Sequence, residues 1–456
     1  MNKTECMENH RSKYMYRLFA GLYSFLMVLS AGAADSTAVM KLSLDEAVQV
    51  AGENNRNLIN ARYDVQIARR SYLETLANGL PQVAGSAALN DNLKLMTQLI
   101  PAEIFGGPAG EYIPVQFGTK YNANYGFNAT QLIFSAPYLV GLQTTRLMEE
   151  LSKQGLEQTE REVKKSVMSN YFLILVSEKS LEIIRENREN LLETLRQTRK
   201  LQQVGMREKT DVDKIDVSVS MLDNTVRSTE LNIKLNYNLL RFQLGLDPET
   251  EITLTSTLDE TLDRYLAGSL QEKEFIPEKH IDYQIMKTQV EMAEKNLLME
   301  KANFLPTLSG FYSYTRQGMG NEIAIDRWFP SSIIGLQLNV PLFSSGGRYQ
   351  KVKQAKIELE KAVNTRDMIG EQLSITERQY RNYLHTALEK YENQQKNVEV
   401  SERVLESTRR KFEQGMASVF DMVQANNDYL QSESELLNAT LEVLNASLEL
   451  EMLLTN

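Results

Sequence analysis

The residue types that most often carry out chemistry in proteins are scarce in this chain and stand far apart. The single cysteine is Cys6, and the three histidines are His10, His280 and His385. Neither His280 nor His385 has cysteine or carboxylate partners at the spacing of metal ligands, and no phosphate-binding loop, nucleophile elbow or HExxH pattern occurs. The sequence therefore predicts no catalytic, cofactor-binding or metal-binding residue, and it predicts that the protein is not an enzyme.

Two glycine turns are better candidates for functional positions. Each consists of a glycine and its two neighbours: Val204, Gly205 and Met206 in the first turn, and Gln414, Gly415 and Met416 in the second. Each glycine interrupts a long helical pattern, because glycine tolerates the positive φ that ends a helix. Asp211 and Asp421 follow the two glycines by six residues. They either start the returning helices or line a constriction, and the sequence leaves both interpretations open.

The placement of the prolines shows which long elements position these turns. None of the ten prolines lies between Tyr138 and Asp247, and none follows Pro341. Both gaps are rich in Glu, Lys, Gln, Leu and Arg, which form helices well, whereas proline is excluded from helix interiors. From Val352 onward apolar residues recur at steps of three and four, as in helices packed side by side. Long helices are predicted over about 137–204 and 344–413, each ~100 Å long at ~1.5 Å per residue.

The segments between the helical blocks alternate as β-strands do. From Lys120 to Phe134, Tyr, Ala and Phe occupy one face, and Asn and Thr occupy the other. From Ile334 to Leu342, aliphatic residues alternate with Gly, Gln and Asn. This alternation predicts strands with one apolar and one polar face. The expected strands are about 82–94, 120–134, 307–317 and 333–343, with loops at about 95–118 and 318–332.

An internal duplication covers almost the whole chain. The sequence Ala-Asn-Gly-Leu-Pro at 77–81 recurs as Ala-Asn-Phe-Leu-Pro at 302–306, and the glycine turns with their aspartates recur at a constant offset. Each half is a unit of helix, two strands, long helix, glycine turn and helix. The predicted organisation is a first repeat over 41–250, a connecting segment over 251–276 and a second repeat over 277–456.

Residues 1–33 have the pattern of a signal peptide. Lys13 and Arg17 precede an apolar stretch from Leu18 to Leu29, and Ala-Gly-Ala at 31–33 matches a cleavage site of small residues. The stretch is too short for a membrane anchor. Cleavage would remove Cys6 and leave an exported chain without cysteine. Both Met1 and Met15 are candidate start residues.

Charge and hydropathy exclude further classes of protein. The formal net charge is −10, which argues against nucleic acid as a partner. Beyond the predicted leader no run of 18 apolar, uncharged residues occurs, so an α-helical membrane channel is excluded. The predicted fold class is mostly α, with a small set of strands in each repeat.

The order of these landmarks resembles the TolC family of outer-membrane efflux channels. The opening Leu-Ser-Leu-Asp-Glu-Ala-Val at 42–48, the paired prolines and the duplicated turns carry the resemblance over about residues 41–456. The family implies a homotrimer, with a 12-stranded β-barrel in the outer membrane of a Gram-negative bacterium, continuous with a 12-helix periplasmic α-barrel. It also implies passive export in a tripartite efflux or type I secretion system, with a periplasmic adaptor and an inner-membrane pump as partners and no cofactor.

Elementary physics agrees with a small membrane β-barrel. Four strands cannot close a barrel alone, and open sheet edges are not tolerated in lipid. Three chains supply twelve strands, whose polar faces would line water and whose apolar faces would meet outer-membrane lipid. Aromatic side chains at the membrane interface are expected at Tyr121, Tyr125, Tyr312, Tyr314 and Trp328.

The resemblance also implies roles for the turns. Residues 204–206 and 414–416 would dock the adaptor, and Asp211, Asp421 and Gln424 would lie at the periplasmic gate. Members of the family often have an acidic residue where Gln424 stands and an arginine where Ala417 stands. The contacts that close this gate are therefore expected to differ, with Arg207, Glu208 and Lys209 as candidates.

A second interpretation is a secreted or periplasmic structural coiled-coil protein without a pore. The alternating strands favour the channel, because a rod has no need of them. Drug, metal and protein substrates are not distinguished by the sequence, and neither are the particular pump and adaptor.

Overall fold

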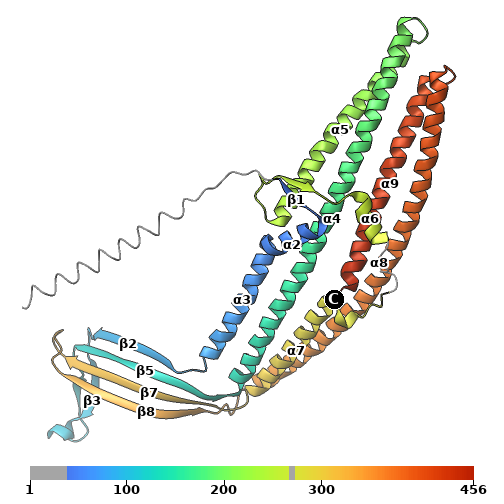
Figure 1. The fold of residues 1–456 in the computed structure, drawn as a ribbon. Coiled ribbons are helices and arrows are strands. Elements are labelled where there is room, and N and C mark those ends of the chain that lie inside the picture. Colours follow the sequence, from blue (N-terminus) through green and yellow to red (C-terminus); the bar gives the residue numbers. More distant parts are fainter. Residues whose placement is uncertain (1–38, 267–272, 456) are drawn as a thin grey trace, which may run out of the picture.

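The fold is an elongated bundle of helices with a β-sheet at one end and two helical tips at the other (Figure 1). The computed structural model describes residues 39–266 and 273–455, so the predicted leader at 1–33 lies outside the described residues. Helix α4 (Ala136–Gln203) has 68 residues and helix α8 (Gly347–Glu413) has 67. These two helices occupy the proline-free gaps and run through most of the length of the molecule.

Shorter helices pack beside the two long ones to form a row of four. Near the sheet the neighbours are α3 (Arg56–Ala77), α4, α7 (Ile281–Ala302) and α8. Near the tips they are α5 (Lys209–Leu244), α4, α9 (Val419–Leu454) and α8. None of the described helices is long and apolar enough to span a membrane.

The four strands expected from the alternation form one antiparallel sheet. Its order is β2 (Gln82–Asp91), β5 (Tyr121–Ser135), β7 (Thr307–Gly320) and β8 (Trp328–Asn339). The strands of the two repeats therefore meet at the β5–β7 pair, where Phe127 lies opposite Tyr314. In the described chain the outer edges of β2 and β8 pair with no further strand.

The register of this sheet separates an apolar face from a polar one. The apolar face carries Val83, Leu89, Tyr125, Phe127, Tyr312, Ile334, Leu336 and Leu338. The polar face carries Ser86, Asn124, Asn128, Ser313 and Gln337. The alternation seen in the sequence is thus continued across all four strands.

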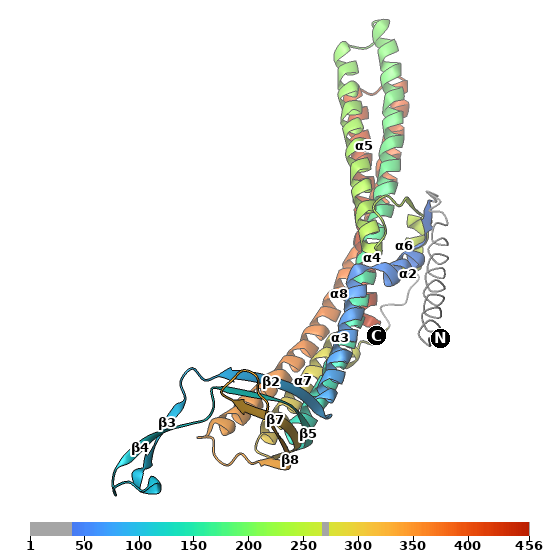
Figure 2. The same ribbon diagram turned by 90° about the vertical axis from the view of Figure 1, so that its left-hand side faces the viewer.

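The structure corrects both predicted loops. Residues 95–118 contain a second hairpin, of β3 (Met96–Pro101) and β4 (Tyr112–Phe117), around a short 3-10 helix, η1 (Ala102–Phe105). This hairpin projects beyond the four-stranded sheet (Figure 2). The glycines and prolines of its turn concealed two short runs of strand-forming residues.

The second loop is shorter than predicted, and the last strand lies earlier. Strand β8 runs over Trp328–Asn339 rather than 333–343, and β7 continues to Gly320. Pro330 and two serines concealed the start of β8, because these residues favour turns. Helix α8 begins at Gly347 rather than 344, after Ser345 and Gly346 adopt φ values of 47° and 80°.

The largest buried cluster lies at the middle of the bundle. Here β1 (Met40–Leu42) pairs with β6 (Ile252–Leu254), and α2 (Leu44–Asn54) and α6 (Leu258–Leu266) pack against α4. The buried Tyr171 hydroxyl donates to the Leu42 carbonyl oxygen at 3.0 Å. Part of the predicted connecting segment, 251–276, therefore packs against the waist of the molecule, although residues 267–272 lie outside the described chain.

Candidate functional site at the helical tips

The two tip turns have the same backbone geometry. Gly205 has φ +78° and Gly415 has φ +73°. After each glycine a methionine N–H donates back into the preceding helix, from Met206 to Leu201 at 2.9 Å and from Met416 to Lys411 at 2.8 Å. This is the glycine-terminated helix end that satisfies two orphan carbonyls. The prediction of positive φ at both glycines is confirmed.

Apolar side chains project from these turns into solvent. Met206 and Met416 are each 73% exposed, and Val204 is 69% exposed. Both tips lie at the same end of the molecule (Figure 1). Below them a small buried cluster joins the two helical hairpins, made by Leu191, Leu195, Ile215, Val219, Phe412, Ala417, Val419 and Met422. The tips thus combine a packed base with an exposed apolar rim.

The two aspartates stand at equivalent positions in the first turn of the returning helices, with different partners. The Asp421 carboxylate accepts from the Ser418 backbone N–H at 2.9 Å and from its hydroxyl at 2.7 Å. These hydrogen bonds with Ser418 hold the pKa of Asp421 below its usual value. At the first tip Glu208 stands in place of Ser418 and makes no side-chain cap. Asp421 therefore forms a capping box with Ser418 at the start of α9, whereas Asp211 has no capping partner of this kind.

Arg207 links the two tips. Its guanidinium donates to the Ala417 carbonyl oxygen at 3.3 Å and stacks on the Phe412 ring, with 4.7 Å to the ring centroid. Arg207 follows the first glycine turn, and both of its partners belong to the second hairpin. The backbone of Ala417 in the second tip is thus contacted by an arginine of the first tip. Gln424 is exposed, and among the described residues its one hydrogen-bond partner is Asp428 of the same helix, at 2.7 Å.

Two asparagines between the hairpins were missed by sequence analysis. Asn187 of α4 and Asn426 of α9 are buried and exchange two amide hydrogen bonds of 3.0 Å. A buried amide pair at a helix interface specifies register, because any slip would leave both amides unsatisfied. The sequence feature that could have revealed this pair is an asparagine on the apolar stripe of a helix, once in each repeat.

The predicted interface aromatics gather at the apolar face of the sheet. Tyr125 contacts Trp328 with ring centroids 5.1 Å apart, and Phe127 contacts Tyr312 and Tyr314 at 5.8 and 5.9 Å. Tyr121 lies on the same face, opposite Gly320. Trp328 is the first residue of β8 and not a loop residue. These rings form a band across three strands.

The two histidines each have one carboxylate neighbour, which corrects the expectation that they stand alone. His280 Nδ1 lies 3.6 Å from Asp282, and His385 Nε2 lies 3.6 Å from Glu389. A metal site needs more ligands than this. In residues 39–266 and 273–455 no group of three or more His, Cys, Asp or Glu side chains is arranged to hold a metal ion.

The described chain combines a sheet that has one apolar and one polar face with helices of more than sixty residues that end in exposed glycine turns. This is the architecture of an elongated, membrane-associated protein. The family model for outer membrane efflux proteins matches residues 47–246 and 279–456. The chain therefore belongs to the outer membrane efflux protein family, and it is an outer-membrane protein of the TolC type. This confirms the family resemblance and the predicted outer-membrane location.

Two individual relatives match different shares of the chain. The outer membrane protein TolC of Vibrio cholerae is 21% identical over 405 residues, which cover 88% of this chain and 87% of that protein. The alkaline protease secretion protein AprF of Pseudomonas aeruginosa is 26% identical over 137 residues, or 30% of this chain and 28% of AprF.

Solved structures show the same fold. The Campylobacter jejuni CmeC outer membrane channel superposes with a TM-score of 0.71 at 16% identity, covering 90% of this chain and 85% of CmeC. The Vibrio cholerae outer membrane protein VceC gives 0.68 at 14% identity, covering 90% and 95%.

Proposed function

We propose that three copies of this chain form the exit duct of a tripartite efflux or type I secretion system. The duct passively conducts substrates that an inner-membrane pump and a periplasmic adaptor deliver. The observation that carries this proposal is the four-stranded sheet, which has one apolar face, one polar face and two unpaired edges. Such edges are not stable in lipid, and twelve strands from three copies remove them while leaving a wet lumen.

The helical half supports the same assembly. Helices α5 and α8 end the row near the tips, and each has apolar side chains that remain exposed in the single chain. These are Val217, Met221, Leu231, Leu235, Leu239 and Phe242 on α5, and Ile357, Met368, Ile375, Val400 and Val404 on α8. At about 100° per residue each set falls on one face of its helix. Packing α5 of one copy against the tip half of α8 in the next, and α3 against the sheet half of that α8, would bury both stripes and close a 12-helix tube.

The tips then lie at the periplasmic end of the tube. We assign adaptor docking to residues 204–206 and 414–416, because exposed methionine and valine side chains on rigid turns suit an apolar contact. We assign the gate to the same end, with Asp211, Asp421 and Gln424 beside the Arg207 contact. This proposal involves no catalysis and no cofactor.

Topology provides a direct test of the duct against a coiled-coil rod without a pore. Single cysteines at 206 and 320 in a Cys6→Ser background should react differently with an impermeant maleimide. On intact cells position 320 should be labelled and position 206 should be protected until the outer membrane is permeabilised. Labelling of 206 but not 320 on intact cells would overturn the orientation, and a protein absent from purified outer membranes would favour the rod.

A further inference from the structure

At the waist of the molecule each repeat has a joint, that is, a place where one helix ends beside the start of another. The two joints differ in how they are packed. In the first repeat α5 ends where α3 begins, and Asn55 caps α3 by accepting from the Asn57 N–H at 2.9 Å. The Asn55 amide also donates to the Gln243 carbonyl oxygen at 2.6 Å. Gly245, with φ +68°, sits so close that an added Cβ would lie 2.1 Å from the Asn54 carbonyl oxygen. This first joint is closed.

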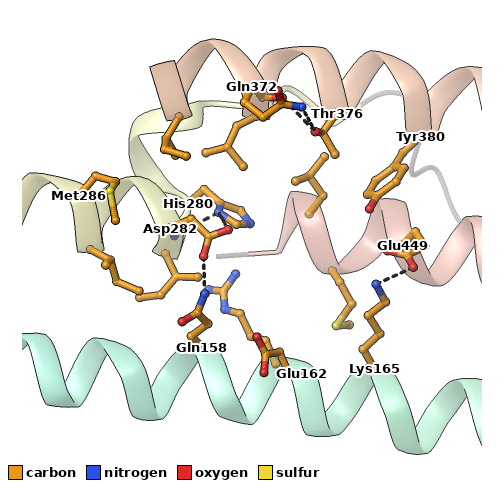
Figure 3. Close-up of a pocket in the computed structure, with 17 residues that line it drawn as sticks. Gln158, Glu162, Lys165, His280, Asp282, Met286, Gln372, Thr376, Tyr380 and Glu449 are labelled. Atoms are coloured by element: carbon orange, nitrogen blue, oxygen red, sulfur yellow. Dashed lines mark hydrogen bonds and ion pairs between the residues drawn. The ribbon is translucent and has the colours of Figure 1, made fainter. Parts of the chain in front are cut away.

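The second joint is hollow. Where α9 ends and α7 begins, a cavity of about 550 Å³ opens between α4, α7, α8 and α9 (Figure 3). Its apolar walls are Ile281, Ile285, Ile369, Leu373, Met452 and Leu453. This volume lies in the range of small-molecule sites, which are mainly apolar with a few placed polar groups.

His280 takes the place of Asn55 and leaves a donor facing the cavity. Its Nδ1 accepts from the Asp282 N–H at 3.3 Å, so the neutral ring carries its proton on Nε2. Burial is the main effect on His280 and lowers its pKa. The ring is therefore neutral at neutral pH. His280 is only 9% exposed and no described residue accepts from its Nε2, which is open to the space of the cavity and is left to water. The first joint satisfies its Asn55 amide, whereas the second leaves one N–H unused.

The charged groups around the cavity are compensated within the protein. Lys165 pairs with Glu449 at 2.5 Å, and Gln158 donates to Asp282 at 2.9 Å (Figure 3). Arg161 donates to the Thr455 carbonyl oxygen at 2.8 Å and pairs with Glu157 at 2.9 Å. Glu162 has no partner in the described chain, and it is exposed to solvent. An ionic ligand would therefore find no unpaired buried charge.

We propose that this cavity binds an uncharged, amphipathic small molecule. Its apolar body would lie against the isoleucine, leucine and methionine walls, and one carbonyl or hydroxyl oxygen would accept from His280 Nε2. Because four helices from both repeats line the cavity, the ligand would brace the second joint as Asn55 and Gly245 brace the first. The proposal does not depend on the exit-duct function.

Photolabelling with benzophenone tests the site, because this probe is uncharged, apolar and carries one carbonyl oxygen. The full chain in lipid nanodiscs is irradiated with increasing benzophenone, and labelled peptides are mapped by mass spectrometry. Saturable labelling is expected on the peptides that contain Met286 and Met452. Ile369→Trp, which fills the cavity, should abolish it. Labelling of the apolar face of the sheet serves as an internal control and should not change.

His280→Asn provides the matched variant, because asparagine keeps the cap of α7 as Asn55 does for α3. It replaces the Nε2 donor by an amide N–H on a shorter side chain, which reaches less far into the cavity, so half-saturation should require about three- to tenfold more probe. No saturable labelling of the Met286 and Met452 peptides, or labelling that Ile369→Trp leaves intact, would overturn the site and leave a water-filled cavity. Labelling that responds to Ile369→Trp but not to His280→Asn would overturn the anchoring role of His280.

Discussion

The two tips share one turn but begin their returning helices differently. Both end a long helix with glycine at positive φ and the same backward hydrogen bonds. The second tip then starts α9 with the Ser418–Asp421 capping box, whereas Glu208 leaves α5 without a side-chain cap. The first tip in turn supplies Arg207, whose guanidinium reaches the backbone of the second. Duplication has kept the turn, and the two copies have divided the contacts between them.

This division gives each tip a different part in the contact. The capped second tip presents the carbonyl oxygen of Ala417 and the ring of Phe412. The first tip contributes the long, charged side chain that binds them.

The largest effect is expected from replacing either tip glycine by proline. Proline holds φ near −65°, whereas Gly205 and Gly415 need values of +78° and +73°. Gly205→Pro or Gly415→Pro should reduce export to background while trimers persist in the membrane. Dye accumulation in cells that express each variant measures the export.

Gly155→Ala is the control for these variants, because Gly155 lies inside α4 with open space at the Cβ position. It should retain export and stabilise the chain by roughly 0.5–1 kcal/mol. Normal efflux in both proline variants would rule out the docking role of the tips.

A smaller effect is expected from removing the link between the tips. Arg207→Ala loses the hydrogen bond to Ala417 and the stacking on Phe412, together worth on the order of 1–2 kcal/mol. If this contact helps to close the duct, the closed channel should leak, and mean conductance in planar bilayers should rise several-fold. Arg207→Lys should be intermediate, because lysine keeps the charge and loses the planar guanidinium. Lys209→Ala, two residues further on at the start of α5, is the matched control. Lys209 was also a candidate for closing the gate, but it is exposed and makes no hydrogen bond or ion pair to the second tip in the described chain. Equal conductance in all four proteins would exclude a closing role for Arg207.

The smallest effect is expected at Asp421. In a trimer three copies of this carboxylate would surround the axis, and Asp421→Asn should weaken cation selectivity modestly, since Gln424 supplies no second acidic layer. Ser418→Ala breaks the capping box and keeps the charge, so it should leave selectivity unchanged. Identical reversal potentials for wild type and Asp421→Asn in a salt gradient would show that Asp421 acts only as a helix-capping residue and not in ion selectivity.

The sequence by itself determined the elements whose signals are local. Proline-free gaps marked α4 and α8, because a single proline would break a helix wherever it stood. Glycine marked both tips, because positive φ is a property of one residue. Alternation over Lys120–Phe134 marked β5, because a strand with two environments needs a period of two.

Only the tertiary structure decided the features that depend on distant partners. Strand β8 begins at Trp328 because Gly318 and the Tyr125 ring lie beside it, although Pro330 and its serines favour a turn. Arg207 pairs with Ala417 across 210 residues of sequence, and Asn187 pairs with Asn426 across 239. The first joint is tightly packed and the second contains a cavity, because the helices pack differently at the two joints. No local sequence pattern encodes the space that such packing leaves empty.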